Sequence, residues 1–309
     1  MPFRRESEIL DCGAGMFLGV SKILMTAALV CAALGISACG EEAEKTVSVS
    51  EKSSVSENAA PKVSPKGPRG EARVSREGVT LCEAEGVSVL MYHMIGDEPD
   101  NGAILTEKNF RRQLELIRAG GFHLISMEEL YAYVTEGAPL PEKPVCITFD
   151  DGYADNYSIV YPLMKEYGYP WTVFVITGDV GKPNRMTWEE LSEMAESRAV
   201  TIASHTATHP ELAEISPDAA RADLETAQKA LRDRLGIENH WLAYPYGSYN
   251  AEVMEIVKSL GIRMVVTSDG GRVHKGDSPY RLRRAWIGNE VTDDNYLERL
   301  TRDDYTPVS

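Results

Sequence analysis

Strand-like and helix-like stretches alternate at regular spacing between residues 86 and 302 of this 309-residue chain. Apolar runs predict strands at residues 87–94, 122–125, 145–149, 171–177, 199–204, 241–244, 262–267 and 282–287. Amphipathic runs predict helices at residues 107–119, 126–135, 155–167, 188–196, 217–235, 250–260 and 292–302. This alternation predicts an α/β fold with a parallel sheet and helical crossovers. Such strands can close into a (β/α) barrel or form an open, doubly wound sheet.

Several of the expected helices begin at recognisable capping residues. Thr106, Ser126 and Thr187 each stand directly before an amphipathic run. There a hydroxyl oxygen can accept a hydrogen bond from an unpaired N–H of the first turn. Pro162 lies inside the helical run at residues 155–167 and predicts a bend, because proline lacks the N–H that a continuous helix needs.

The predicted strand at residues 145–149 ends abruptly at two carboxylates, Asp150 and Asp151, followed by Gly152. Two like charges at the end of a buried strand repel each other, and each costs energy to desolvate. A positive partner is therefore expected beside them. A metal ion is the first interpretation, with one aspartate as a ligand and the other free for proton transfer.

Two histidines, His205 and His209, follow the predicted strand at residues 199–204. Residues four apart fall on one face of a helical turn, or can converge from a loop. Neutral imidazoles suit zinc and similar metals, and three ligands, two histidines and one aspartate, leave positions open for water and substrate. A pair of surface histidines in a loop is the alternative that the spacing leaves open.

Aromatic residues surround a proline and a glycine in the run Tyr244-Pro245-Tyr246-Gly247. This run can be a tight turn, or it can wall a sugar site with the Tyr246 N–H directed at a substrate oxygen. Like the aspartates and the histidines, it lies at a predicted strand end. Strand ends share one face in a (β/α) barrel, whereas an open sheet gathers them only near a switch point. The barrel is therefore favoured.

The first 85 residues are not expected to belong to the barrel. An apolar run at residues 23–36 has the length of a signal-peptide core and is short for a transmembrane helix. The stretch that ends at Cys39 resembles a bacterial lipobox, which implies cleavage before Cys39 and lipidation of its sulfur. An ordinary signal peptide or an uncleaved anchor is the alternative. Met16 is an alternative start, because the stretch after it makes a conventional signal.

The expected organisation is a lipoprotein signal peptide at residues 1–38, a tether at residues 39–85 and a folded domain at residues 86–309. The tether is rich in Glu, Lys, Ser and Pro, and it buries too little apolar surface to order itself. The signal and lipid predict attachment to the cell membrane on its extracytoplasmic side. The protein is expected to be a monomer.

Charge and cysteine usage narrow the class of protein. The formal net charge of −15 argues against a nucleic-acid binder, which carries a basic face, and it is compatible with a neutral substrate. Only Cys82 and Cys146 remain once the signal has left and Cys39 carries lipid. Cys146 lies in an apolar strand and is interpreted as a small buried hydrophobe. A Cys82–Cys146 disulfide is the alternative for an exported protein.

Three motifs in order resemble those of the NodB-type polysaccharide deacetylases, carbohydrate esterase family 4. They are TFDD at residues 148–151, HTATH at residues 205–209 and YPYG at residues 244–247. The resemblance covers roughly residues 86–300. It implies a distorted (β/α) barrel of about seven strands that removes N-acetyl groups from sugars with a divalent metal.

The resemblance assigns roles residue by residue. Asp151, His205 and His209 become the metal ligands, and Asp150 becomes the general base. Zinc is the expected metal, with cobalt, nickel or iron permitted by the same ligands. Acetate and a glucosamine unit are the expected products.

The opening strand narrows the resemblance to a subgroup. VLMYH at residues 89–93 resembles the start of the biofilm poly-N-acetylglucosamine deacetylases. That subgroup is circularly permuted, and its N-terminal histidine replaces one that other members carry in a late Leu-x-His motif. No histidine follows Trp286 in this chain. The resemblance therefore implies that His93 is the general acid, and a hydrogen-bonded core histidine is the alternative.

One departure from the family pattern concerns the base. Many members carry an arginine two residues before the motif proline, where this chain has Ala243. That arginine orients the base, so Asp150 needs another partner. Arg284 is favoured, because its register resembles a late arginine motif of the subgroup, and a surface ion pair is the alternative. Trp286 is expected to line the acetyl pocket or to pack in the core.

The expected function is metal-dependent N-deacetylation of N-acetylglucosamine units in an extracellular or cell-wall polysaccharide. Tyr244, Pro245, Tyr246 and Trp286 are expected to bind the substrate or the oxyanion. A peptidoglycan or chitooligosaccharide deacetylase and an O-acetyl xylan esterase are alternatives on the same fold. A catalytically dead carbohydrate-binding lipoprotein is the alternative outside the enzymes.

Overall fold

A computed structural model of the protein describes residues 10–11, 68–97 and 101–305. Its main sheet is parallel, and seven strands follow one another in the order β12-β11-β10-β9-β8-β3-β13, with β6 beside β8. The bounds are β3 Ser88–Tyr92, β6 His123–Leu124, β8 Pro144–Phe149, β9 Trp171–Val175, β10 Val200–Ser204, β11 Trp241–Ala243, β12 Met264–Val266 and β13 Ala285–Trp286.

The two outer strands of this sheet, β12 and β13, are joined by the segment at residues 279–286. Along β12, Val265 N–H donates to Pro279 O and Leu282 N–H donates to Val265 O. Further along, β13 pairs with β3. One segment therefore contacts both edges of the sheet, and it closes the sheet with a short irregular seam. The predicted distorted barrel of about seven strands is confirmed.

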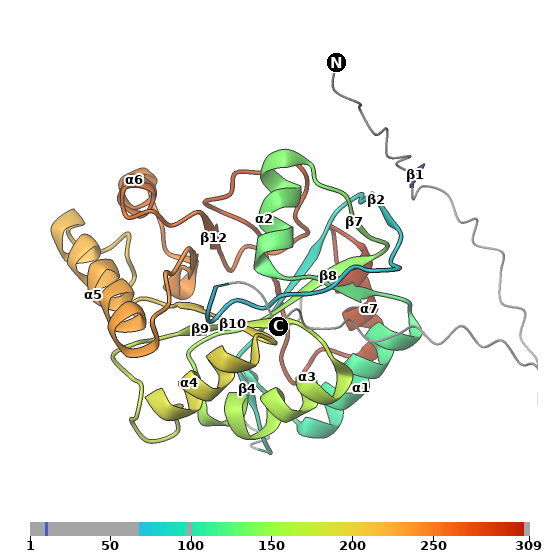
Figure 1. Ribbon diagram of the computed structural model, residues 1–309, viewed down its shortest axis with the longest axis horizontal. Coiled ribbons are helices and arrows are strands. Elements are labelled where there is room, and N and C mark those ends of the chain that lie inside the picture. The colour runs from blue at the N-terminus through green and yellow to red at the C-terminus, as the bar shows by residue number, and fades with distance from the viewer. Residues whose placement is uncertain (1–9, 12–67, 98–100, 306–309) are drawn as a thin grey trace, which may run out of the picture. The chain divides into compact units, whose positions relative to one another are not determined.

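Helices lie around the strands on all sides in Figure 1. They are α1 Glu107–Ala119, α2 Met127–Glu136, the π-helical turn η1 Asn156–Val160 with α3 Tyr161–Tyr167, α4 Trp188–Ser197, α5 Pro217–Leu235, α6 Ala251–Ser259 and α7 Asp293–Thr301. The predicted caps are confirmed, since the Thr106, Ser126 and Thr187 hydroxyls each accept from the N–H three residues ahead. The distortion expected at Pro162 takes the form of the π-helical turn directly before α3.

Short strands and one 3-10 turn complete the described elements. They are β1 Leu10–Asp11, β2 Leu81–Glu83, β4 Met94–Ile95, β5 Ile104–Leu105, β7 Leu140–Pro141 and η2 Pro245–Gly247. β2 pairs with β7, and Ala72 is buried with its N–H donating to Thr201 Oγ1 of β10. The chain therefore packs against the barrel from about residue 70, earlier than the expected start at Gly86.

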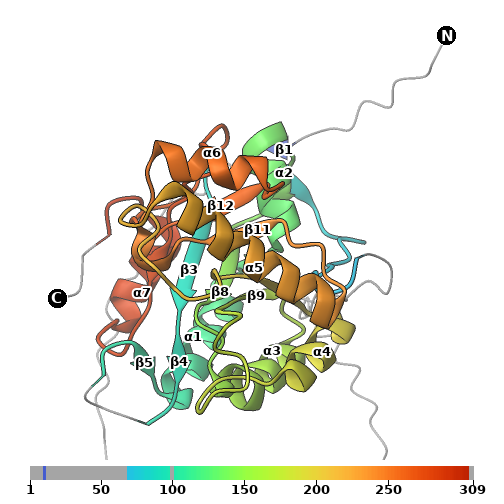
Figure 2. The same ribbon diagram turned by 90° about the vertical axis from the view of Figure 1, so that its left-hand side faces the viewer.

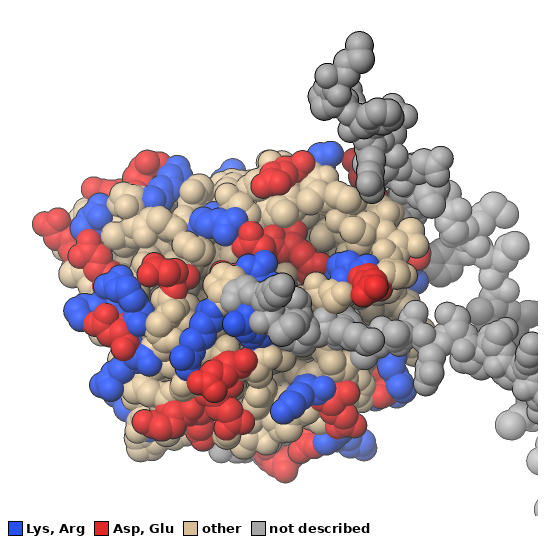
Figure 3. Space-filling view, viewed as in Figure 1, with Lys and Arg blue, Asp and Glu red and all other residues tan. Residues whose placement is uncertain are grey.

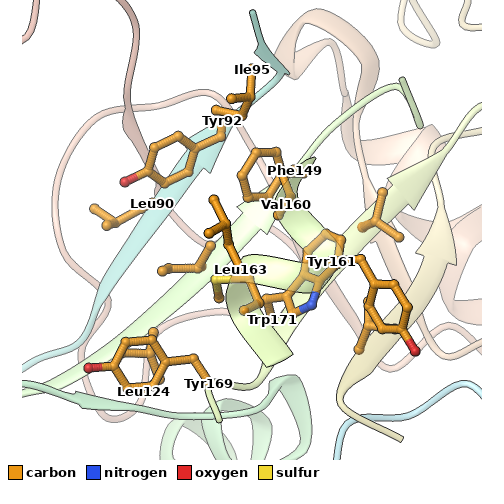
Figure 4. Close-up of a cluster of buried hydrophobic side chains, with 14 of the residues drawn as sticks. Leu90, Tyr92, Ile95, Leu124, Phe149, Val160, Tyr161, Leu163, Tyr169 and Trp171 are labelled. Carbon is orange, nitrogen blue, oxygen red and sulfur yellow. The ribbon is translucent and has the colours of Figure 1, made fainter. Parts of the chain in front are cut away.

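Side chains alternate between two hydrophobic layers along each strand. Leu90, Tyr92 and Phe149 face the cluster between the sheet and the helices, where Figure 4 shows them near Trp171. Residues at alternate positions, such as Cys146, belong to a second cluster that takes residues from six neighbouring strands and so fills the barrel.

Cys146 is a free thiol inside the barrel. Burial raises the pKa of this thiol to about 12, so it behaves as a small apolar side chain. The buried-hydrophobe interpretation is confirmed, and the alternative Cys82–Cys146 disulfide is wrong. The Cys146 Sγ lies 3.8 Å from Met127 Sδ, in the cluster that fills the barrel.

The predicted signal peptide, Cys39 and most of the tether lie outside the described residues. Within the described ranges, no helix is both long enough and apolar enough to cross a membrane.

Candidate active site

Polar side chains from separate strands gather where the strands end. Asp150 and Asp151 follow β8, His205 follows β10, His93 follows β3 and Arg284 directly precedes β13. They line one pocket of about 470 Å³. A smaller cavity of about 190 Å³ beside α1 contains none of these groups. The prediction that the motifs meet at one end of a barrel is confirmed.

Three of these side chains could hold a metal ion. Asp151 Oδ1 lies 3.5 Å from both His205 Nε2 and His209 Nε2. The two Nε2 atoms are 3.2 Å apart. Asp151 Oδ1 is buried and accepts no hydrogen bond from any described residue. A buried, unsatisfied carboxylate oxygen facing two imidazole nitrogens fits a cation, and the donor set suits zinc and similar metals.

The imidazoles are held in the form that binds a metal. His205 Nδ1 lies 2.8 Å from Ala243 O, and because a carbonyl can only accept, the proton sits on Nδ1 and leaves the Nε2 lone pair free. Burial lowers the pKa of both His205 and His209, which keeps the rings neutral. The second histidine is positioned by its loop, where Asp223 of α5 accepts from the Ala207 N–H at 2.7 Å.

Strained backbone concentrates around this site. Asp151, Thr206, His209 and Tyr246 have φ angles of 72°, 68°, 59° and 57°, in the left-handed region that side chains other than glycine rarely adopt. Such conformations cost about 1–3 kcal/mol each and are retained where function needs them. Here they turn two metal-ligand candidates and the Tyr246 ring toward one pocket.

The second aspartate, Asp150, forms a buried pair with Arg284. Arg284 donates from Nη1 and Nη2 to the two Asp150 oxygens at 2.7 and 2.6 Å. Both side chains are at most 3% exposed. Burial alone raises the pKa of Asp150, but the guanidinium outweighs it and the pKa falls to about 2. The contact predicted between Arg284 and Asp150 is present, although Arg284 comes from the seam and not from the turn that carries the usual family arginine.

Arg284 is itself anchored to two strands. Its Nε donates to Thr267 O at 2.8 Å, and Nη1 also donates to Thr148 Oγ1 at 3.1 Å. Thr148 Oγ1 in turn donates to Leu90 O at 2.8 Å. The arginine therefore has a single orientation, and the Asp150 carboxylate is fixed by it.

His93 lies in the loop between β3 and β4 and lines the same pocket. It is partly buried, and its Nδ1 is buried without a hydrogen-bond partner in the described part of the chain. The unpartnered Nδ1 gives no support to the alternative of a hydrogen-bonded core histidine. The acid role stays a prediction.

Of the residues predicted to bind the substrate, three line the pocket and one lies behind it. Tyr246 is 67% exposed, and its ring lies 4.6 Å from the His209 ring. Trp286 is partly exposed and lines the pocket with Tyr244. Pro245 is buried in the turn and does not line the pocket. Pro245 therefore supports the turn that carries Tyr246.

One wall of the pocket was not expected from the sequence. Tyr153, Asp179 and Arg185 line it. The Arg185 guanidinium stacks 3.8 Å from the Tyr153 ring centroid, and its Nε lies 3.6 Å from Asp179 Oδ2. Their position in the sequence could have predicted this wall. Asp179 and Arg185 follow the end of β9, on the face where the other strands also present polar residues.

The fold and the pocket define a class of protein: (β/α)-barrel hydrolases whose pocket joins a candidate metal site to a buried carboxylate paired with an arginine. Residues 137–265 match the sequence family described as polysaccharide deacetylase. YxkH of Bacillus subtilis, whose name places it among the polysaccharide deacetylases, is 31% identical over 199 residues, which are 64% of this chain and 70% of YxkH. The chain belongs to the polysaccharide deacetylase family.

Two further comparisons concern named deacetylases. The poly-β-1,6-N-acetyl-D-glucosamine N-deacetylase of Staphylococcus epidermidis is 26% identical over 200 residues, 60% of this chain and 69% of that protein. The Escherichia coli protein of the same name is longer, and the match spans 34% of it.

Solved structures agree with this assignment. Streptococcus pyogenes deacetylase PplD in complex with acetate superposes with a TM-score of 0.66 at 28% identity, covering 70% of this chain and 98% of PplD. IcaB from Ammonifex degensii gives 0.63 at 26% identity and covers 70% and 96%.

Proposed function

We propose that this polysaccharide deacetylase removes acetyl groups from N-acetylglucosamine units of an extracellular polysaccharide, with poly-β-1,6-N-acetylglucosamine as the first candidate. The observation that carries the proposal is the division of the two adjacent aspartates. Asp151 faces His205 and His209, while Asp150 faces Arg284. One carboxylate is thereby available to a metal and the other to a proton.

The residues of the pocket divide the work of amide hydrolysis. Asp151, His205 and His209 would hold a divalent metal, which would supply Lewis-acid polarisation and a lowered pKa of water and so offset the weak basicity of a carboxylate with a pKa of about 2. Asp150, ionised at neutral pH, accepts the proton of the attacking water. The Tyr246 N–H donates to the oxyanion. His93 donates a proton to the leaving amine of the sugar.

The choice of substrate rests on the relatives and on surface charge. Relatives in Staphylococcus epidermidis and Escherichia coli are named for poly-β-1,6-N-acetylglucosamine. On the face drawn in Figure 3, acidic and basic side chains are interspersed, so neither sign forms a broad patch for a polyion. A neutral glycan is consistent with this surface.

The test is acetate release from a panel of poly-N-acetylglucosamine, chitin oligomers, peptidoglycan and acetylxylan, with and without a chelator. We expect release from the first substrate, loss with chelator and recovery with zinc, cobalt, nickel or iron, zinc being the expected native metal. Preferred release from acetylxylan would overturn the substrate assignment. Absence of release from every substrate in the metal-loaded protein would instead support a dead binding protein.

Two matched variants test the division of the aspartates. Asp150→Asn should retain the metal and lose turnover by about 10²-fold or more, because a general base contributes 10²–10⁴-fold. Asp151→Asn should lose metal affinity, measured as metal content after dialysis. Near-normal deacetylation by Asp150→Asn would contradict the base assignment.

Location follows from the sequence outside the described residues. Cleavage before Cys39, lipidation of its sulfur and a tether leading to the barrel would hold a monomeric enzyme on the extracytoplasmic side of the membrane. Labelling with a fatty-acid analogue should mark the wild-type chain and not Cys39→Ser. Equal labelling of both would contradict the lipid site.

A further inference from the structure

The loop that carries His93 is held from one side by two neighbouring side chains. Asn156 Nδ2 donates to the His93 carbonyl oxygen at 3.0 Å. Two residues further, the Ile95 N–H donates to Asp155 Oδ1 at 2.9 Å. The two side chains are also joined, since Asn156 Nδ2 donates to Asp155 Oδ1 at 2.8 Å. The backbone is thus hydrogen-bonded both at His93 and two residues after it.

These side chains do not serve their own helix. Asp155 stands at the N-cap position of η1, yet its side chain makes no capping hydrogen bond there. Asn156 is fully buried, and its Oδ1 has no hydrogen-bond partner among the described residues. An unsatisfied buried amide oxygen costs about 1–3 kcal/mol. Stability of the helix therefore gives no reason for this pair, whereas one hydrogen bond from each side chain goes to the neighbouring loop.

The pair also links the histidine to the catalytic aspartates. Asp155 and Asn156 follow Asp151 by four and five residues, in the same segment. They enter a π-helical turn, a distortion often found at functional sites. In Figure 2, β4 continues the line of β3 beyond the sheet, and it contacts this turn. One segment thus supplies the base and a metal-ligand candidate, and also holds the strand that carries the acid.

One nitrogen of the His93 ring has no hydrogen bond with a described residue that would orient it. Its buried Nδ1 has no hydrogen-bond partner in the described ranges. Catalytic imidazoles are commonly oriented by a carboxylate or a carbonyl on the second ring nitrogen. Here the position of the ring depends on the backbone to which it is attached.

We propose that Asp155 and Asn156 are positioning residues for His93, holding its backbone so that the imidazole faces the leaving group across the pocket. This inference rests on the proposed role of His93 as general acid. Neither residue lines the pocket, so neither is expected to touch substrate.

The test uses two substrates that differ in their need for an acid. Amide deacetylation of acetylated glucosamine oligomers requires protonation of the amine, whereas 4-nitrophenyl acetate releases a phenolate that needs no proton. His93→Ala should lower kcat on the amide much more than on the ester. Asn156→Ala should reproduce this pattern with a loss of about 10-fold to 100-fold on the amide, since small misplacements of a catalytic group cost about that much.

Coupling to His93 separates positioning from a merely structural role. In the His93→Ala background, Asn156→Ala should cause no further loss of amide turnover, because residues acting through one group are not additive. Asp155→Asn retains an acceptor for the Ile95 N–H and should keep near wild-type turnover, whereas Asp155→Ala should not. Asn239→Ala is the matched control, since Asn239 is also a buried asparagine, accepts from the Trp241 N–H and lies outside the pocket.

The outcomes separate the two proposals. If His93→Ala leaves amide turnover unchanged, the acid assignment fails and this inference falls with it. If His93→Ala is impaired on the amide but Asn156→Ala is not, only the positioning inference fails. It also fails if Asn156→Ala slows amide and ester equally, or if its loss multiplies with that of His93→Ala. Metal content and Tm, measured on every variant, show whether each variant is folded and loaded.

Discussion

Replacement of Arg284 by methionine removes a buried charge partner at nearly constant side-chain length. In the folded protein the pKa of Asp150 is about 2 against an ordinary value of 3.8. Each pKa unit corresponds to about 1.4 kcal/mol, so the surroundings of Asp150 stabilise the folded state by about 2 kcal/mol at pH 7. Without the guanidinium, nothing compensates the desolvation of the Asp150 carboxylate, and the free energy of unfolding is expected to fall by about 3–5 kcal/mol.

The pH dependence of this loss has a definite sign. A carboxyl whose pKa is depressed in the folded state contributes stability that is present above its unfolded pKa, near 3.8 here, and is lost as pH falls through about 2. The contribution should fall to roughly half by pH 3. The difference in free energy of unfolding between wild type and Arg284→Met, measured by urea denaturation, should therefore narrow between pH 5 and pH 3.

Two further variants sharpen this experiment. Arg284→Lys keeps the charge but cannot form the two parallel hydrogen bonds, so it should be intermediate in stability and in acetate release. Arg299 is also buried, but it donates to the carbonyls of Trp286 and Asn295 and meets the nearby Glu298 carboxylate only through charge. The loss in free energy of unfolding caused by Arg299→Met should therefore vary less over this pH range than the loss caused by Arg284→Met.

Loss of the Arg284 guanidinium should also lower catalytic turnover. Because this arginine alone orients Asp150 by a bidentate contact, Arg284→Met should lower kcat for deacetylation by about 10²-fold. Full activity together with a pH-independent stability loss would refute the reasoning.

Three other perturbations have definite expected outcomes. Gly288→Ala places a Cβ against the Trp286 ring and against the backbone oxygen of Gly102, so it should lower Tm and, by displacing Trp286, also raise KM for the glycan; a lowered Tm with an unchanged KM would place Trp286 outside the substrate path. Burial raises the pKa of Asp155 to about 6. The free energy of unfolding of the wild type should therefore fall by up to about 3 kcal/mol relative to that of Asp155→Asn as pH rises from 4 to 6.5. A difference between the two that stays constant with pH in urea denaturation would contradict this. Native wild type and native Cys146→Ala should titrate equally with a thiol reagent and differ by one thiol in guanidinium chloride; a difference in the native state would contradict burial of Cys146.

The local pattern of the chain was enough for the order of elements and for the face that carries the chemistry. Period and capping residues place each strand and helix, because both depend on neighbours within a few residues. Strand ends in a barrel share a face, so Asp150, His205 and Tyr246 could be placed together before their distances were known. The choice of Asp151, His205 and His209 as metal ligands came from the motifs shared with the family and not from this rule.

Local sequence patterns did not predict where the folded domain begins or which distant segments contact each other. The packing of Ala72 on Thr201 joins residues 129 positions apart, and composition alone assigned this stretch to the tether. The wall formed by Tyr153 and Arg185 depends on two loops meeting, and nothing local in either segment specifies the other.

The sequence by itself placed the candidate site residues at the ends of strands, because strand periodicity depends only on local pattern, and the resemblance of its motifs to a family supplied their expected roles. Only the tertiary structure decided how they are held. Arg284 lies 134 positions from Asp150, and it reaches that carboxylate because an irregular seam closes the barrel beside β3. The hydrogen bond from the Asn156 side chain to the His93 carbonyl joins residues 63 positions apart. Contacts of this kind depend on how the sheet curls, which is a property of all its strands together and of no single segment.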